Sequence, residues 1–427
     1  MKRILILISL LLLALTTGCH IGALDTQGDA AMQSNAKSLK IQAWVSTPMC
    51  PAKHCPLVAR DLVSYVETIR SKASSHFDDT YDEPGNIDTF RSVVTLIWQQ
   101  KWAQATSLAK TIKYEIVRFY DTGEANSCDK TTYHLLRPIE ETPTAAHEGW
   151  GIYFFRAKNA PRREIAIEAP HVVKDMQTAR LSAELFRNTR AQMFAMSSNH
   201  RCGHEHDTDC SSGGGTSVCN EDDDDNSKHD YRKSDMSHTT NSYFQAFHEV
   251  VTDLTTLNIL QIHGNGSSNN AFSFGNGTKE LSTDPDLPIN ALALEFLKRV
   301  NQVLAFKNLQ AVTGGSCNWN GNNKPNFVKE TKLCGTLNTQ GRYTNIDGQN
   351  LNACIDSVTT PNHRFFHIEL KRDLRDAEKS GEANNLSRFL LGQAIMGARK
   401  EGKKLFPLLN SKFPCSVPPP FQPVFKR

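Results

Sequence analysis

Four polar residues of this sequence stand at the ends of apolar runs, where a protein core would normally exclude them. His171 and Asp175 follow the run "IAI", His263 follows "LNILQI", and Glu369 stands late in "RFFHIEL". Burying such groups is costly unless they are paired or bind something. Two imidazoles and a carboxylate are a common ligand set for zinc with an open position for water, and a separate glutamate nearby can take a proton from that water.

A fourth apolar run ends in "SSNHRC", which carries His200 and Arg201. An arginine can hold an anionic substrate group through two parallel hydrogen bonds. Each polar residue also has an ordinary explanation, because a histidine at a strand end is often part of the hydrogen-bonded core. Glu369 can simply pair with Lys371 or Arg372. The recurrence of polar groups at the ends of successive runs favours a site.

The segments around these runs have the periodicities of an α/β protein. Helical spacing occurs over residues 61–72, 87–120, 241–252, 288–306 and 385–400, and in the segment that begins "MQTARL" before the strand at 191–196. Strands are expected at "GIYFFR", "REIAIEA", 191–196, 257–262 and "RFFHIEL", the first two joined by a turn. Strands that alternate with helices predict a largely parallel sheet with helices on both faces. Ligands bind beyond the carboxyl ends of such strands, where all four polar groups could meet.

Four short motifs resemble those of the N-formylglutamate amidohydrolase family and occur in the same order. "APHVVKD" is similar to its S-x-P-H-x-G-x-x-D turn, "SSNHR" to a strand ending in arginine, "LQIHG" to a strand ending in D-x-H-S, and "HIELKRDL" to its E-I-N-R-x-L segment. The similarity covers roughly residues 165–375. That family is related to zinc carboxypeptidases, so the resemblance implies a three-layer α/β/α sandwich of the zinc-exopeptidase type.

The resemblance also implies a ligand set for one Zn²⁺ per chain. His171 and His263 correspond to metal-binding histidines, and Asp175 corresponds to the carboxylate ligand, with Glu168 as the alternative. Two departures bear on this choice: the glycine after the first histidine is missing, with Val172 and Val173 in that turn, and Gln261 stands where the family has an acid.

The remaining roles follow from the same motifs. Glu369 corresponds to a general base, and Arg201 and Arg372 correspond to residues that bind or orient an anionic substrate group. Four more polar residues could support the site from nearby segments: His200, Asp235, His238 and His248.

The amino-terminal residues predict export. Lys2 and Arg3 precede an apolar run that ends at Leu15, which is the pattern of a signal peptide over residues 1–18 and is too short for a comfortable membrane span. Gly18-Cys19 resembles the lipobox of bacterial lipoproteins and predicts a lipid on Cys19. Cleavage nearby with a secreted product is the alternative. His20, in place of aspartate, would direct a lipoprotein to the outer membrane of the cell envelope.

Cysteine usage agrees with an oxidising compartment. The chain has 11 cysteines, and without Cys19 an even set remains, which suggests disulfides. Zinc is the competing explanation for Cys202, Cys210 and Cys219, but no C-x-x-C pair is present. We therefore expect a tether over residues 19–40 and one domain over 41–425, with disulfide-pinned loops at about 202–230 and 313–362.

Composition excludes some functions. A net charge of +3 over 427 residues gives no broad basic surface for nucleic acid. No G-x-S-x-G elbow is present, and Thr252 stands where H-E-x-x-H would need its second histidine. The expected function is an exported zinc-dependent hydrolase of an amide or peptide bond. Its substrate would be a small peptide or amide, and cell-wall peptides are one candidate source. The alternative is a non-catalytic lipoprotein that uses the same fold as a binding module.

Overall fold

The computed structural model describes most of residues 50–409. The described ranges are 50–73, 81–123, 132–139, 150–157, 160–208, 210, 218–219, 231–266, 269–322, 324–346, 351–375 and 382–409, all within one compact unit, residues 47–427. The predicted signal peptide, Cys19 and the tether lie outside these ranges, as do Cys128 and Cys415. Within them, no helix has the length and apolar character that a membrane crossing requires.

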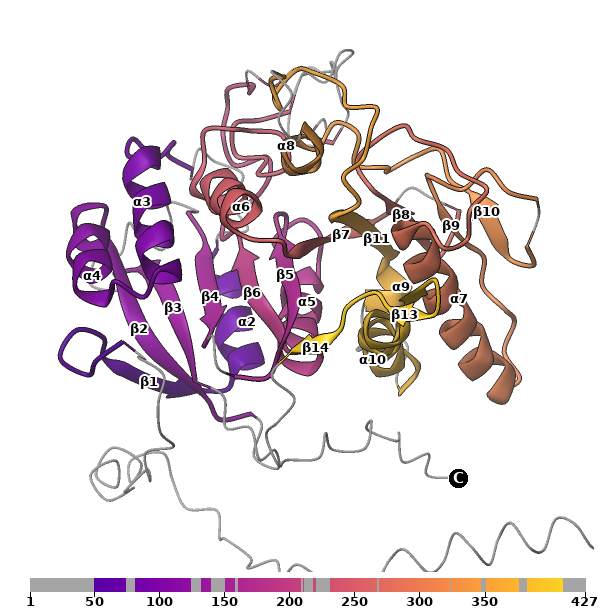
Figure 1. Cartoon of the computed structure of the whole chain (residues 1–427), viewed down its shortest axis with the longest axis horizontal. Coiled ribbons are helices and arrows are strands. Elements are labelled where there is room, and N and C mark those ends of the chain that lie inside the picture. The colour runs from indigo at the N-terminus through magenta and orange to yellow at the C-terminus, as the bar shows by residue number, and fades with distance from the viewer. Residues whose placement is uncertain are drawn as a thin grey trace, which may run out of the picture. The chain divides into compact units, whose positions relative to one another are not determined.

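A 12-stranded mixed sheet runs through this unit (Figure 1). In spatial order its strands are β1 (Leu57–Arg60), β2 (Tyr114–Asp121), β3 (Thr132–Pro138), β4 (Ile152–Arg156), β6 (Ala191–Met196), β5 (Arg162–Ala169), β7 (Asn258–Asn265), β11 (Phe365–Lys371), β8 (Phe272–Gly275), β9 (Gly314–Ser316) and β10 (Phe327–Lys329), with β14 (Leu408–Leu409) paired to β5. Strands β6, β5, β7 and β11 are mutually parallel, whereas β2, β3 and β4 pair antiparallel. A short hairpin, β12 (Arg399–Lys400) and β13 (Lys403–Lys404), stands apart.

Helices cover both faces of the sheet and bury separate cores. One core contains residues of α3 (Ile87–Trp98), α4 (Trp102–Thr111) and α6 (Tyr243–Leu254). The other contains residues of α2 (Leu62–Lys72), α5 (Thr178–Thr189), α7 (Pro288–Phe306) and α10 (Glu382–Gly397). Two short helices, α8 (Thr339–Ile346) and α9 (Arg372–Arg375), follow β10 and β11. The predicted α/β fold with a mixed, largely parallel sheet is confirmed.

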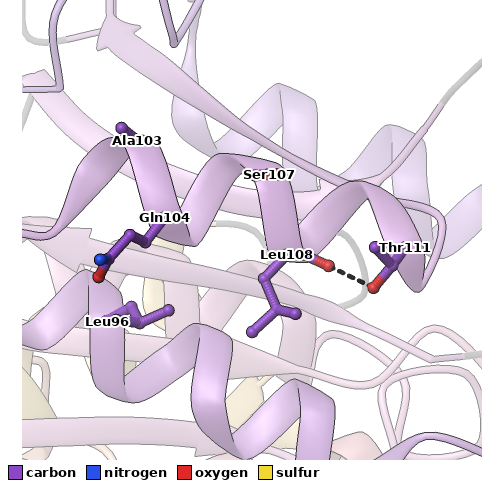
Figure 2. Close-up of a pocket in the computed structure, with 6 residues that line it drawn as sticks. All are labelled: Leu96, Ala103, Gln104, Ser107, Leu108 and Thr111. Carbon is purple, nitrogen blue, oxygen red and sulfur yellow. Dashed lines mark hydrogen bonds between the residues drawn. The ribbon is translucent and has the colours of Figure 1, made fainter.

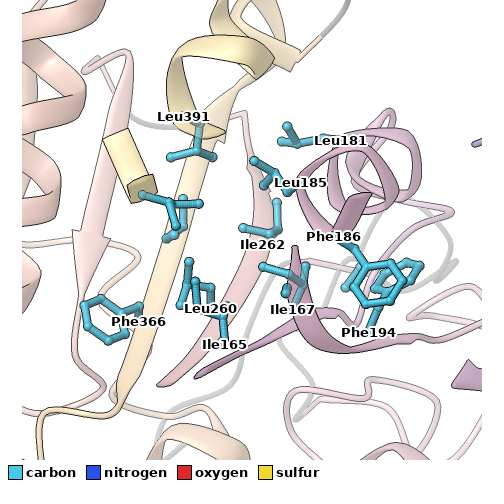
Figure 3. Packing of buried hydrophobic residues seen from close by; sticks show 14 of the residues in the cluster. Ile165, Ile167, Leu181, Leu185, Phe186, Phe194, Leu260, Ile262, Phe366 and Leu391 are labelled. Carbon is cyan, nitrogen blue, oxygen red and sulfur yellow. The ribbon is translucent and has the colours of Figure 1, made fainter. Parts of the chain in front are cut away.

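Side chains of the central strands alternate between the two faces of the sheet and so pack in the two cores. Ile165 and Ile167 of β5 pack in one core with Leu260 and Ile262 of β7, as Figure 3 shows, whereas Ala166 lies in the other. Successive side chains of a strand point to opposite faces, so a strand buried on both faces is apolar at nearly every position.

One sequence prediction about local structure was wrong. The helix expected over residues 87–120 is α3 and α4 followed by strand β2, and Gln100 and Lys113 interrupt it with positive φ angles of 62° and 60°. Residues 313–362 also contain β9, β10 and α8 in addition to loops.

Four disulfides join described cysteines: Cys50–Cys55, Cys202–Cys219, Cys210–Cys354 and Cys317–Cys334. Cys202, Cys210 and Cys219 all lie in these disulfides, as the sequence predicted. The Cys210–Cys354 bridge joins positions separated by 144 residues and ties the loop before α6 to the segment after α8.

Candidate metal centre

Three neighbouring parallel strands place polar side chains on one face of the sheet. In the pairing register Glu168 lies beside Gln261, Gln261 beside His367, and His263 beside Glu369. Residues two apart on a strand share a face, so these side chains form one polar group. All are buried, with at most 5% of any residue exposed. The candidate site is therefore internal to the sheet face, and His263 and Glu369 lie within their strands and not beyond them.

The turn after β5 completes this group. Asp175 Oδ2 lies 3.6 Å from His171 Nδ1 and 3.8 Å from His263 Nδ1. The backbone N–H of Gly264 donates to the same oxygen at 2.9 Å, which holds the carboxylate between the two rings. The centroids of the two imidazoles are 5.0 Å apart. The structure thus brings together the two histidines and the aspartate that the sequence nominated.

These three residues fit a tetrahedral metal ion. His171 Nδ1 is buried and has no hydrogen-bond partner within the described part of the chain, while His171 Nε2 bonds Asp235 Oδ1 at 2.8 Å. His263 Nε2 is likewise occupied, at 2.8 Å from Gln261 Oε1. Both rings therefore direct Nδ1 at Asp175. Zinc bound to nitrogen and oxygen at 2.0–2.1 Å in a tetrahedron separates its ligand atoms by about 3.4 Å, close to the separations found.

Two adjacent groups of possible ligands are less suitable. His171, Asp235 and His238 form one, but the guanidinium of Arg201 already neutralises Asp235 there. His263, His367 and Glu369 form the other. In this group His263 could offer only Nδ1, the nitrogen that faces Asp175, because Gln261 occupies Nε2. Because one imidazole nitrogen binds one ion, an ion held by this group would compete with an ion at Asp175 for His263 Nδ1. We therefore take the group around Asp175 as the best-formed candidate.

Asp235 holds the surroundings of His171 in place. Its Oδ2 accepts from Arg201 Nε at 2.9 Å and Nη2 at 2.5 Å, and its Oδ1 lies 2.8 Å from His238 Nδ1. The ring of His238 stacks on Tyr231 with centroids 3.4 Å apart. A carboxylate that bonds the far nitrogen of a metal-binding histidine orients the ring and fixes its tautomer. Arg201, which the sequence suggested for substrate binding, is thus engaged as the counter-ion of Asp235.

The charges of the group suit a cation. Burial opposes ionisation of Asp175, but His171, Arg201 and the Gly264 N–H outweigh it and lower its pKa. Burial, together with His367 and His171, holds the pKa of His263 well below its usual value. Burial and Arg201 disfavour a proton on His171, yet Asp235 and Asp175 raise its pKa overall. Metal ligands must be deprotonated, so His263 and Asp175 are ready to bind, whereas a proton competes for His171.

Glu369 is paired with a residue that the sequence analysis missed. His367 Nε2 lies 3.1 Å from Glu369 Oε1, while Glu369 Oε2 is buried without a hydrogen-bond partner among the residues that the structure describes. The ring of His367 lies against His263, with centroids 4.3 Å apart. Gly335 closes over it with φ +70°, and a Cβ there would stand 2.8 Å from His367 Cγ. Alternation within "FFHIELK" could have identified His367, since it shares its strand face with Glu369.

Glu168 is not part of the aspartate-centred group. Its Oε2 accepts from Gln261 Nε2 at 3.1 Å, and its Oε1 lies 2.9 Å from His248 Nδ1. His248 Nε2 in turn lies 2.8 Å from Thr344 Oγ1. Geometry therefore favours Asp175 as the carboxylate ligand and places Glu168 and His248 behind Gln261.

Two nominated residues remain, His200 and Arg372. His200 is buried and accepts from the backbone N–H of Cys202, and burial, with Lys174 and Arg201 nearby, lowers its pKa to about 4. Arg372 begins α9 and is partly buried. Arg375, which was not nominated, is buried, donates to the carbonyl of Leu370 and packs against Gly264.

An apolar pocket occurs elsewhere, between α3 and α4. Figure 2 shows its lining, and its volume is about 500 Å³. The lining residues are Leu96, Ala103, Gln104, Ser107, Leu108 and Thr111. None of them belongs to the metal-binding candidate, so this pocket has no role in the argument about chemistry.

Comparisons with known proteins add little to the geometry. No protein-family model matches the chain, and no curated protein matches it. Among solved structures, a metallo-carboxypeptidase from Pseudomonas aeruginosa in complex with (2-guanidinoethylmercapto)succinic acid is similar at 10% identity and a TM-score of 0.29. The match covers 63% of this chain and 62% of that protein. The likeness is too weak to bear on the chemistry of the site.

Proposed function

We propose that this chain is an exported, zinc-dependent hydrolase of an amide or peptide bond. The observation that carries the proposal is the set of three facing ligand atoms, His171 Nδ1, Asp175 Oδ2 and His263 Nδ1, buried and supported from behind by hydrogen bonds. His171, Asp175 and His263 would hold one Zn²⁺. A bound zinc ion supplies Lewis acidity and lowers the pKa of a bound water to about 7.

Glu369 is the residue that we propose as the general base. It lies beside His263 on the neighbouring strand. His367 holds its Oε1, while its Oε2 has no hydrogen-bond partner in the described ranges. A carboxylate with one anchored and one free oxygen can accept a proton from water and return it to a leaving amine. Arg201 supports the site through Asp235, and Arg372 remains our candidate for an anionic group of the substrate.

Export and anchoring are part of the proposal and rest on the sequence of residues 1–19. The four disulfides support an oxidising compartment, because such bonds persist mainly outside the cytosol. We propose a lipid on Cys19, a location in the bacterial cell envelope at the outer membrane, and small peptides or amides of cell-wall origin as substrates. No nucleic-acid partner is proposed.

A binding module is the second candidate. The favouring observation is burial: His171, His263 and Glu369 are each 5% exposed or less, so a substrate would reach them only if the segments that bury them moved. A protein that holds an ion only to stabilise a binding surface would tolerate such closure.

The two candidates separate in one experiment on matched preparations. Zinc content is measured together with hydrolysis of a panel of N-acyl amino acids, dipeptides and cell-wall stem peptides. We expect Glu369→Gln to keep zinc and lose turnover by about 100-fold or more, the scale of general base catalysis. His171→Ala should lose both. A parent that holds zinc but hydrolyses nothing supports the binding module, and full turnover by zinc-loaded Glu369→Gln contradicts the mechanism.

A further inference from the structure

We propose that Gln261 is a positioning residue that keeps the proton of His263 on Nε2 and so leaves Nδ1 free for the ion. This inference rests on the proposed metal-binding function, which it deepens. Gln261 is fully buried on β7, two residues before His263 and on the same strand face. Its Oε1 lies 2.8 Å from His263 Nε2. If that amide oxygen is fixed, His263 Nε2 must be the nitrogen that carries hydrogen.

The amide of Gln261 is fixed on its nitrogen side by Glu168 and Gln340. Gln261 Nε2 donates to Glu168 Oε2 at 3.1 Å and to Gln340 Oε1 at 3.2 Å. Gln340 has no freedom to turn its own amide, because its Nε2 donates to the backbone carbonyl of Met236 at 2.8 Å. A carbonyl only accepts, so the oxygen of Gln340 faces Gln261 and demands a donor there.

The oxygen side is fixed independently by Asn338. The nitrogen Nδ2 of Asn338 donates to Gln261 Oε1, while its Oδ1 accepts from the backbone N–H of Gly341 at 2.9 Å. A backbone N–H only donates, which places the oxygen of Asn338 toward Gly341 and its nitrogen toward Gln261. Two backbone groups therefore set the direction of the amide, and the direction of the amide sets the tautomer of His263.

The other tautomer of His263, with hydrogen on Nδ1, competes with the one that binds the ion, so the contact with Gln261 matters. With hydrogen on Nδ1, His263 would face the carboxylate of Asp175, 3.8 Å away, and would present no lone pair to the ion. Removing the acceptor at position 261 should shift His263 toward this form. Outer partners of metal-binding histidines typically contribute about 10–100-fold to metal affinity.

The test uses the tautomer directly and needs no substrate. Long-range ¹H–¹⁵N NMR of the metal-free protein, labelled with ¹⁵N-histidine, reports which nitrogen of His263 carries hydrogen, and His263→Gln identifies the signal. Zn²⁺ affinity is then measured by competition with a chelator. Gln261→Met keeps size and removes the acceptor, and should shift the tautomer and weaken Zn²⁺ binding about 10–100-fold.

Gln245→Met is the matched control. Gln245 is also a fully buried amide of this network and contacts Gln340, but it touches neither Gln261 nor His263 in the bonds described. Its substitution should leave the tautomer and the affinity unchanged. Hydrogen on Nδ1 of His263 in the parent protein overturns the inference, and this result does not depend on whether any variant folds. Unchanged Zn²⁺ affinity in Gln261→Met also overturns it. A parent that binds no Zn²⁺ refutes the proposed function itself, whatever the tautomer.

Discussion

Replacing Asp235 by asparagine should destabilise the folded protein by about 3–5 kcal/mol. Asp235 is 1% exposed and accepts from His171, Arg201, His238 and the backbone N–H of Ser237. Burial opposes its ionisation, but Arg201 and the two histidines hold the pKa of Asp235 well below its usual value. Asparagine keeps the shape and removes the charge, so Arg201, with 12% of its side chain exposed, loses its counter-ion. Breaking a buried ion pair from one side costs about 3–5 kcal/mol.

Urea unfolding of the disulfide-intact protein at pH 7 measures this loss as a change in the free energy of unfolding. Arg201→Met and the double variant complete a thermodynamic cycle. The double variant should cost less than the sum of the single variants, because the second substitution removes the charge that the first left unpaired. A loss below about 1 kcal/mol for Asp235→Asn, or additive single effects, would refute the reasoning about this ion pair.

Three further predictions concern other parts of the chain. Burial lowers the pKa of His134 to about 4 from 6.5. The stability that the neutral His134 contributes is therefore fully present above about pH 6.5, and about 3 kcal/mol of it is lost as pH falls toward 4. His134→Gln keeps an acceptor for the Cys50 N–H and should flatten this part of the pH dependence of the free energy of unfolding, measured with denaturant. Replacing Cys210 and Cys354 by serine opens a loop of 144 residues and should lower the free energy of unfolding by up to about 5 kcal/mol, and a loss under about 1 kcal/mol would contradict the pairing. Cys19→Ser should release the protein from membranes in a fractionation experiment, and unchanged membrane partition would reject the lipid anchor.

The parallel centre of the sheet could be predicted because its signals are local. Runs such as "IAI" and "MFAM" are apolar at consecutive positions, which is typical of strands buried on both faces. The polar residues that interrupt or follow such runs stand out for the same reason, and this pattern located His171, Asp175, His263 and Glu369. Their convergence follows from the meeting of neighbouring parallel strands along one face.

The supporting contacts could not be predicted because they join distant segments. Asp235 is 64 residues from His171, and Asn338 is 77 residues from Gln261. No local spacing encodes such pairs. The prediction for strand β2 was wrong for a similar reason. Its apolar positions continue the helical periodicity before it, and only its pairing with β1 and β3 makes it a strand. The ion pair between Arg201 and Asp235 could not be predicted either, because a motif shows a charge but not its counter-ion.

The stoichiometry of Zn²⁺ binding tests the central claim most directly. Metal-free parent protein, titrated with Zn²⁺ and analysed by native mass spectrometry, should bind one ion per chain with high affinity. His171→Ala and His263→Ala should each lose that ion, whereas His134→Gln, which alters a buried histidine on β3, should keep it. A parent that binds no Zn²⁺, or ligand variants that bind it as tightly as the parent does, would contradict the account.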